Sequence, residues 1–143
     1  MEDVAAVLTE PALTNIGIVL PEDGFHEKLR ELCTKYGTLL IIDETHTICV
    51  GPGGYGRQFG LKPDLLTIGK PIGGGIPSAA FGMTEEVASQ LEEMMNEDSI
   101  DVSGIGGTLT ANAFSLRATR ATLANSLSKY HFEVSIPLPL SDL

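Results

Sequence analysis

Basic residues are scarce in this 143-residue sequence, which has nine Lys and Arg against nineteen Asp and Glu and a formal net charge of −10. Nucleic acids and anionic membranes both attract proteins through basic surfaces. The charge balance therefore argues against DNA, RNA and anionic membranes as partners. Long hydrophobic runs are also missing, since none approaches the ~20 apolar residues of a membrane-spanning helix.

Cysteine is rare as well. Cys33 and Cys49 form neither a C-x-x-C pair nor a spacing typical of a metal site. The acidic start, MEDVAAVLTE, does not have the pattern of a signal peptide. We therefore expect two reduced thiols and a cytoplasmic protein. The length predicts one domain.

The central stretch from Leu39 to Gly75 contains two apolar runs, and each run leads to one ionisable residue. LLII leads to Asp43, and LLTIG leads to Lys70. Runs that do not alternate with polar residues are typical of interior strands of a parallel sheet. Ligands of open α/β sheets bind beyond the carboxyl ends of such strands. We therefore expect Asp43 and Lys70 to face one crevice.

Further elements fit an α/β fold. A strand is expected at 4–8, with Glu10 at its tip, and a helix at 25–36, with Asp23 as a plausible cap and Gly37 as a stop. A small-residue strand is expected at 78–82, and helices from Thr84 and from Thr110 to about Leu123. Residues 51–56, GPGGYG, read as an irregular loop rather than a helix or strand.

Lys70 and Asp43 carry the chemical hypothesis. Most lysines are solvated surface charges, but this one follows a buried strand and precedes PIGGG. Burial would make its amine a nucleophile toward the aldehyde of a cofactor, held as a Schiff base. Asp43 could keep a pyridine nitrogen protonated, or it could be an ordinary cap. Glu44 should point away from Asp43, and His46 is as readily a core or surface histidine as a cofactor contact.

Two other enzyme classes have weaker support. LLIIDE is similar to the magnesium-binding strand of nucleotide triphosphatases, but the phosphate-loop motif needs Gly at 64 and Ser or Thr at 71, where the chain has Asp64 and Pro71. A metal hydrolase could use Glu10, Asp43 and His46, but no paired histidine motif supports it. We therefore expect no metal site.

Residues 1 to about 124 resemble the class III (subgroup II) aminotransferases, most closely the glutamate-1-semialdehyde aminomutase branch. The resemblance rests on EP, DExxT, PD followed by T-x-GK, and GGG-x-P, in that order and spacing. It implies a partial large domain of the aspartate-aminotransferase-like fold (pyridoxal-phosphate fold type I), with a mostly parallel sheet and flanking helices. The chain would be the middle of such an enzyme, and the tail 125–143 does not match.

The resemblance also implies roles for individual residues. Lys70 would bind pyridoxal 5'-phosphate covalently and move the proton at the substrate Cα, and Asp43 would pair with the pyridine nitrogen. Asn15 would lie near the cofactor's phenolic oxygen. His46 stands where the family has Gln or Met, and Thr45 stands where it has the valine that packs on the ring.

Thr108, in a segment similar to the family's GTFSGNPLA, would bind the phosphate of the other subunit's cofactor, which implies a homodimer. The implied activity is amino-group transfer between a small-molecule amino donor and a carbonyl acceptor. Glutamate-1-semialdehyde 2,1-aminomutase activity is an alternative, as is a non-catalytic remnant that pairs with an intact subunit. The 143-residue chain alone should have low or no activity and should leave sheet edges and apolar faces uncovered.

Overall fold

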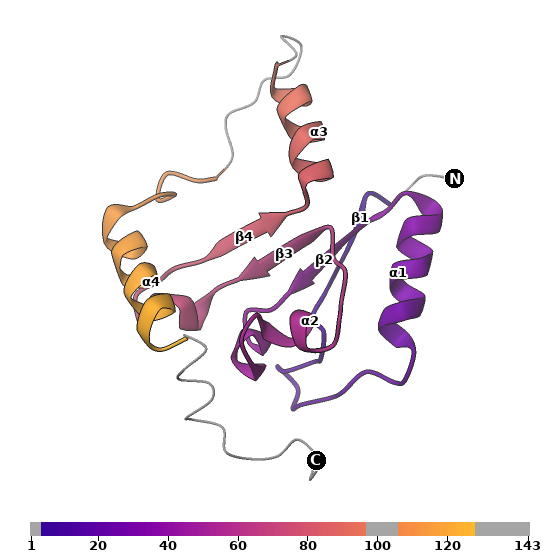
Figure 1. Cartoon of the computed structure of the whole chain (residues 1–143), viewed down its shortest axis with the longest axis horizontal. Helices are drawn as coiled ribbons and strands as arrows, with labels where there is room; N and C mark the ends of the chain where they lie inside the picture. The colour runs from indigo at the N-terminus through magenta and orange to yellow at the C-terminus, as the bar shows by residue number, and fades with distance from the viewer. Residues whose placement is uncertain (1–3, 97–105, 128–143) are drawn as a thin grey trace.

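A four-stranded sheet in the order β1-β2-β3-β4 forms the centre of the protein (Figure 1). The structure is a computed structural model that describes residues 4–96 and 106–127. The first three strands are parallel and the fourth is antiparallel to the third. The strands are β1 (Ala6–Thr9), β2 (Leu39–Asp43), β3 (Leu65–Ile68) and β4 (Ala80–Met83). The predicted α/β fold with a mostly parallel sheet is confirmed.

Helices connect and flank the strands. The four α-helices of the described residues are α1 (Phe25–Tyr36), α2 (Gly54–Gln58), α3 (Glu85–Asn96) and α4 (Ala113–Asn125). Two short 3₁₀ helices are η1 (Thr47–Val50) and η2 (Lys70–Gly73). In Figure 1, α1 lies beside β1 and β2, α4 lies near the start of β4 next to η2, and α3 follows the end of β4 and projects away from the sheet.

The core lies on the face of the sheet that α1 covers. Leu40 and Ile42 of β2 are 3% and 1% exposed, and they form one cluster with the buried Cys33 of α1. Val7 and Leu66, which pair with Leu40 and Ile42 in the register of the neighbouring strands, pack against this cluster. Complete burial of one such aliphatic side chain stabilises a fold by about 1.5–3 kcal/mol.

The opposite face of the sheet is open. Strand residues alternate between faces, so Leu8, Ile41, Leu65 and Phe81 point away from α1. Leu8 is 65% exposed and Phe81 is 51% exposed. The expected uncovered apolar face is therefore present in the described residues.

Two predicted features of the helices are wrong. Gly24, at a φ of 81°, occupies the N-cap of α1, and no side chain caps it, so Asp23 is not the cap. The glycine-rich segment is not wholly irregular, because α2 begins at Gly54. Gly37 ends α1 in a left-handed conformation, as predicted.

The last described helix begins three residues later than predicted. Asn112 caps α4 by accepting hydrogen bonds from the backbone N–H groups of Phe114 and Ser115, both at 3.1 Å. The helix ends at Asn125, inside the predicted tail, and residues 128–143 of that tail lie outside the described part of the chain.

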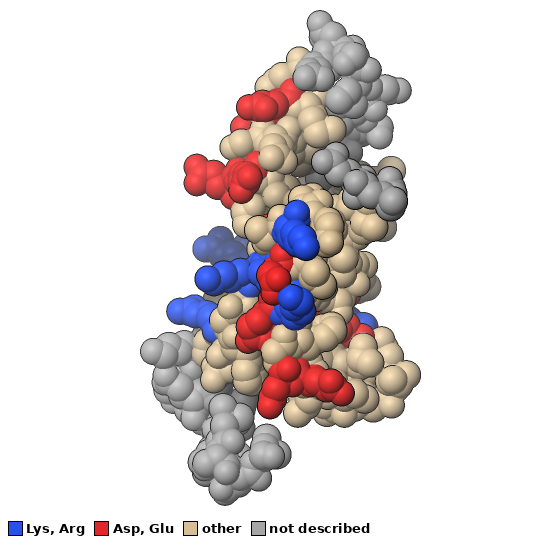
Figure 2. Space-filling view, turned by 90° about the vertical axis from the view of Figure 1, so that its right-hand side faces the viewer, with Lys and Arg blue, Asp and Glu red and all other residues tan. Residues whose placement is uncertain are grey.

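Charges of both signs are interleaved on the face that carries α1 (Figure 2). Arg30 pairs with Asp64 at 2.8 Å, and Lys28 pairs with Glu31 at 2.8 Å. In the described ranges, no helix is both long and apolar enough to cross a membrane.

Candidate active site

Asp43 lies at the carboxyl end of β2 on the open face of the sheet, paired with Thr67 of β3. The Thr45 N–H donates a hydrogen bond to Asp43 Oδ1 at 2.8 Å. Partial burial raises the pKa of the Asp43 carboxyl, but hydrogen bonds from Thr45 and Thr67 and the positive charge of Lys70 outweigh that effect, so the pKa lies below its ordinary value of 3.8. Asp43 is therefore held as a carboxylate.

Lys70 follows β3 at the first position of η2. Its φ of 41° is a left-handed backbone conformation that residues other than glycine rarely adopt. This conformation costs about 1–2 kcal/mol. Such strain is concentrated at functional positions. The loop is anchored by Ile72, which is fully buried, and by close approach to α4, because a Cβ on Gly74 would lie 2.6 Å from Thr122 Oγ1.

Burial of Lys70 was predicted, and that prediction is wrong for the described residues, in which the Lys70 side chain is exposed. The physical reason is the open sheet face: no described helix covers the side of β2 and β3 to which Asp43 belongs. The predicted proximity holds, since Lys70 is near enough to lower the pKa of Asp43.

A groove of about 1130 Å³ runs beside Lys70 between the sheet and α4. Thr45, Thr67 and Phe81 line it from the sheet, and Ser115 and Thr119 line it from α4. Ser115 also donates a hydrogen bond to the Pro77 carbonyl at 3.2 Å, which ties α4 to the segment before β4. The groove is large enough for a heteroaromatic ring with substituents.

His46 joins Lys70 to the tip of β1. Lys70 Nζ lies 2.8 Å from His46 Nε2. On the other side of the ring, His46 Nδ1 is hydrogen-bonded to the Thr14 hydroxyl, which also bonds Glu10. Glu10 Oε2 lies 3.7 Å from His46 Nδ1. Three strand tips, those of β1, β2 and β3, thus contribute ionisable groups to one place.

Within the described part of the chain, no side-chain hydrogen bond or ion pair joins Asn15 or Thr108 to this cluster. Asn15 is exposed in the loop after β1, where it forms a bridge with Gly17. Thr108 is exposed in a turn before α4. Its neighbours Gly107 and Leu109 line the groove. Their predicted roles remain predictions.

Sequence reasoning missed what Glu44 does. It points away from Asp43, as expected, but it is only 1% exposed. Its carboxylate accepts hydrogen bonds from the N–H groups of Tyr55 at 2.7 Å and Gly56 at 2.8 Å. These two donors belong to the start of α2, which favours a negative charge. The glycines of GPGGYG were the available signal, because a Cβ on Gly54 would lie 2.1 Å from Glu44 Oε2.

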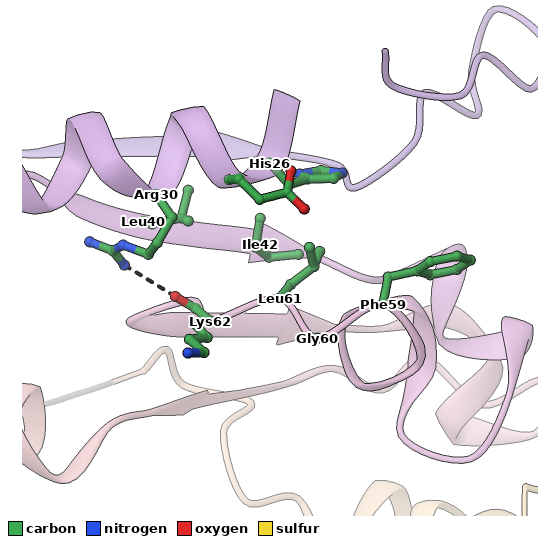
Figure 3. Close-up of a pocket in the computed structure, with 9 residues that line it drawn as sticks. His26, Arg30, Leu40, Ile42, Phe59, Gly60, Leu61 and Lys62 are labelled. Carbon is green, nitrogen blue, oxygen red and sulfur yellow. Dashed lines mark hydrogen bonds between the residues drawn. The ribbon is translucent and has the colours of Figure 1, made fainter. Parts of the chain in front are cut away.

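A smaller pocket of about 280 Å³ lies on the α1 side of the sheet, away from Lys70 (Figure 3). Leu40, Ile42 and Leu61 line it, together with Arg30, which donates a hydrogen bond to the Lys62 carbonyl at 3.2 Å. Arg30 is already neutralised by Asp64. Across residues 4–96 and 106–127, no three His, Cys, Asp or Glu side chains form a group that could hold a metal ion.

The fold and this cluster together define a class of protein. The α/β fold with its mostly parallel sheet is that of fold type I transaminases among the solved structures. The chain superimposes on a glutamate-1-semialdehyde-aminomutase from Pseudomonas aeruginosa PAO1 with a TM-score of 0.82 and 46% identity, covering 90% of this chain and 29% of that one.

A β-phenylalanine aminotransferase from Variovorax paradoxus gives a TM-score of 0.77 with 30% identity over the same shares of the two chains. Residues 1–130 match the model of the family described as Aminotransferase class-III. This chain therefore belongs to the class-III aminotransferase family.

Two curated relatives share one name. The chain is 44% identical over 122 residues to a glutamate-1-semialdehyde 2,1-aminomutase from Methanoregula boonei, and these residues are 85% of this chain and 28% of that protein. A second protein of that name, from Natranaerobius thermophilus, is 43% identical over 123 residues, 85% of this chain and 27% of that protein. The chain spans little more than a quarter of the length of these relatives.

Proposed function

We propose that this chain is the cofactor-holding part of a pyridoxal-phosphate-dependent aminotransferase, in which Lys70 binds the cofactor covalently and Asp43 pairs with its ring nitrogen. The observation that carries the proposal is the presence of both groups on the open side of the sheet, near enough for the Lys70 charge to lower the pKa of Asp43. The solved aminomutase in complex with PMP supports it.

The residues present suit that cofactor. When bound, pyridoxal phosphate supplies an aldehyde that takes up amino groups and a pyridine ring that accepts the electrons left when a Cα proton is removed. Lys70 offers the primary amine for the aldehyde, and Asp43 offers the anion for a protonated ring nitrogen. The buried Ser78 Oγ, which has no hydrogen-bond partner among the described residues, belongs to a groove-lining residue and could meet a polar ligand.

Each residue then has a task of its own. Asp43 stays ionised because Thr45 and Thr67 donate hydrogen bonds to it, so it can hold a proton on a ring nitrogen. Thr45 also lines the groove, where it would lie against the ring. Lys70, at the groove mouth, would accept and release the proton at the substrate Cα.

Asn15 and Thr108 complete the proposal. Asn15 would approach the phenolic oxygen, and Thr108 would bind the phosphate of a second subunit's cofactor in a homodimer. The exposed Leu8 and Phe81 support assembly with further protein, because apolar side chains on a sheet face favour burial. The amino donor and carbonyl acceptor are small molecules. The names of the relatives favour 2,1-aminomutase activity as the alternative reaction.

The decisive experiment adds pyridoxal phosphate to the purified chain, reduces it with borohydride and maps the adduct by peptide mass spectrometry. We expect the pyridoxyl group on Lys70, and no adduct at that position in Lys70→Ala. Lys62→Ala is the matched control, because Lys62 borders the other pocket and should not alter the Lys70 adduct. An adduct spread evenly over the surface lysines would contradict the proposal.

Turnover gives a separate test. We expect the 143-residue chain alone to bind the cofactor weakly and to transfer amino groups slowly or not at all, since it spans little more than a quarter of its relatives. Rapid transamination by the purified chain would show that the groove is complete without further protein.

A further inference from the structure

We propose that Glu10 and Thr14 are positioning residues that fix the tautomer of His46, and through it the hydrogen bond between His46 and Lys70. The four side chains form an unbroken sequence of hydrogen bonds from Glu10 to Lys70 Nζ. The family resemblance supplies no role for Glu10 or Thr14, so the inference rests on this geometry.

Counting hydrogens shows which way each bond runs. The Glu10 carboxylate can only accept, and the Thr14 hydroxyl has one hydrogen to give. Since Thr14 donates that hydrogen to Glu10 Oε2, its oxygen must accept from His46. His46 Nδ1 therefore carries a proton. A neutral imidazole protonated on Nδ1 has its lone pair on Nε2, which accepts a hydrogen bond from the Lys70 ammonium at 2.8 Å.

This arrangement also accommodates a proton transfer. If the proton moves, the Nζ–H bond of Lys70 breaks and an Nε2–H bond of His46 forms. The positive charge then passes to the imidazolium, and the bonds to Thr14 and Glu10 keep their directions. Glu10 Oε2, 3.7 Å from Nδ1, stabilises that charge. Asp43 is a further charged group close to Lys70.

The consequence for chemistry rests on the proposed function. An ammonium must lose a proton before its nitrogen can bond to an aldehyde carbon. His46 Nε2 is the acceptor at hydrogen-bond distance, and Glu10 with Thr14 keeps that acceptor free of its own proton. His46 thereby acts directly on the reacting atom, while Glu10 and Thr14 act through His46.

The first test reads the tautomer by ¹⁵N NMR of the histidine rings in the full 143-residue chain without cofactor. We expect His46 protonated on Nδ1. His26 is an internal contrast, because its Nε2 must donate to the Pro11 carbonyl at 2.8 Å. Thr14→Val should shift His46 toward the Nε2-protonated form, and Thr14→Ser should restore the native tautomer. A native His46 protonated on Nε2 alone, or no change in Thr14→Val, would overturn the proposal.

The second test measures how fast Lys70 reacts, again without cofactor. Competitive labelling with acetic anhydride compares Lys70 with Lys62 in the same sample, so partial unfolding affects both. We expect the Lys70 to Lys62 ratio to fall about tenfold in His46→Gln and Thr14→Val, which is less than the roughly hundredfold that a positioned general base contributes at least to catalysis. Thr14→Ser should retain the ratio, and equal ratios in all variants would refute the inference.

The two proposals fail in different ways. Normal labelling behaviour combined with no pyridoxyl adduct on Lys70 would leave the hydrogen-bond sequence intact and remove the proposed function. A Lys70 adduct combined with unchanged labelling ratios would support the proposed function and refute the positioning role of Glu10 and Thr14.

Discussion

The two faces of the sheet serve different purposes, and β2 shows this within five residues. On the α1 face, Leu40 and Ile42 are almost fully buried, and Glu44 just beyond the strand is 1% exposed with its carboxylate bonded to backbone donors. On the open face, Ile41 is only partly buried and Asp43 lies beside Lys70. One strand therefore places buried residues on one side and a candidate site residue on the other.

Neighbouring acids illustrate the same difference. Glu44 is enclosed by the start of α2, whose N–H groups are fixed in position. Asp43 interacts with the backbone and side chain of Thr45, the side chain of Thr67 and the charge of Lys70, whose side chain is exposed. The Glu44 carboxylate is occupied by the fold, whereas the Asp43 carboxylate retains room to bind another molecule.

The largest expected effect is the difference in stability loss between alanine substitutions on the two faces of the sheet. Ile42→Ala on the α1 face should lower the free energy of unfolding by about 2–5 kcal/mol, because it leaves a cavity in the core. Leu8→Ala on the open face should change it by less than about 0.5 kcal/mol, because Leu8 is 65% exposed. Urea denaturation of the purified chain measures both. Equal costs would show that another molecule covers the open face in solution.

The second effect concerns the neighbouring acids. Glu44→Ala leaves the buried N–H groups of Tyr55 and Gly56 without acceptors, at a cost of about 1–3 kcal/mol each. Asp43→Ala removes one N–H acceptor at a partly exposed position and should cost only about 0.5–1.5 kcal/mol. Thermal unfolding measures the two costs. If Asp43→Ala proves the more damaging, Asp43 has a structural role that its environment does not indicate.

Much of the fold could be predicted from the sequence because local rules govern it. The unbroken apolar runs at β2 and β3 predicted parallel strands, and Gly37 predicted the end of α1. The proximity of Asp43, His46 and Lys70 followed from one rule, that the ends of parallel strands share an edge. Glu10 was recognised as a strand-tip acid for the same reason.

The rest depended on contacts between distant residues. The glycines of GPGGYG indicate a close approach, but they do not identify Glu44, eleven and twelve residues away, as the group that binds the N–H groups there. The start of α2 was therefore missed. The link from Thr14 to His46 spans 32 residues and needs the loop after β1 to fold back. Exposure of Lys70 follows from the uncovered sheet face, which was expected, but the prediction of burial considered only the preceding strand and the PIGGG segment.

A third prediction tests the Glu44 enclosure with two glycines of similar backbone. Gly54 has a φ of 72° and Gly60 a φ of 68°, so alanine at either position costs about 1–2 kcal/mol in backbone strain. Only at Gly54 would the new Cβ meet Glu44, whereas nothing lies within 4 Å at Gly60. Gly54→Ala should therefore destabilise the chain more than Gly60→Ala in denaturant unfolding. Equal losses would mean that Glu44 moves aside freely.

The smallest expected effect is on the pH dependence of stability, through Asp43 on the open face. The lowered pKa of Asp43 contributes stability that is fully present above its ordinary value of 3.8 and is lost as pH falls through the native pKa. Thr67→Val removes one hydrogen bond to the carboxylate, so the Asp43 pKa should rise toward its ordinary value. The loss of stability at acid pH that is due to Asp43 should then shrink by less than about 1 kcal/mol.

Carboxyl NMR titration of Asp43 measures the pKa shift. Thr38→Val is the control, because Thr38 Oγ1 donates to the Val4 carbonyl and should leave Asp43 unchanged. An unchanged Asp43 pKa in Thr67→Val would assign the ionised state of Asp43 to Thr45 and Lys70 alone. Strand β3, which carries Thr67, would then not contribute to stabilising the carboxylate.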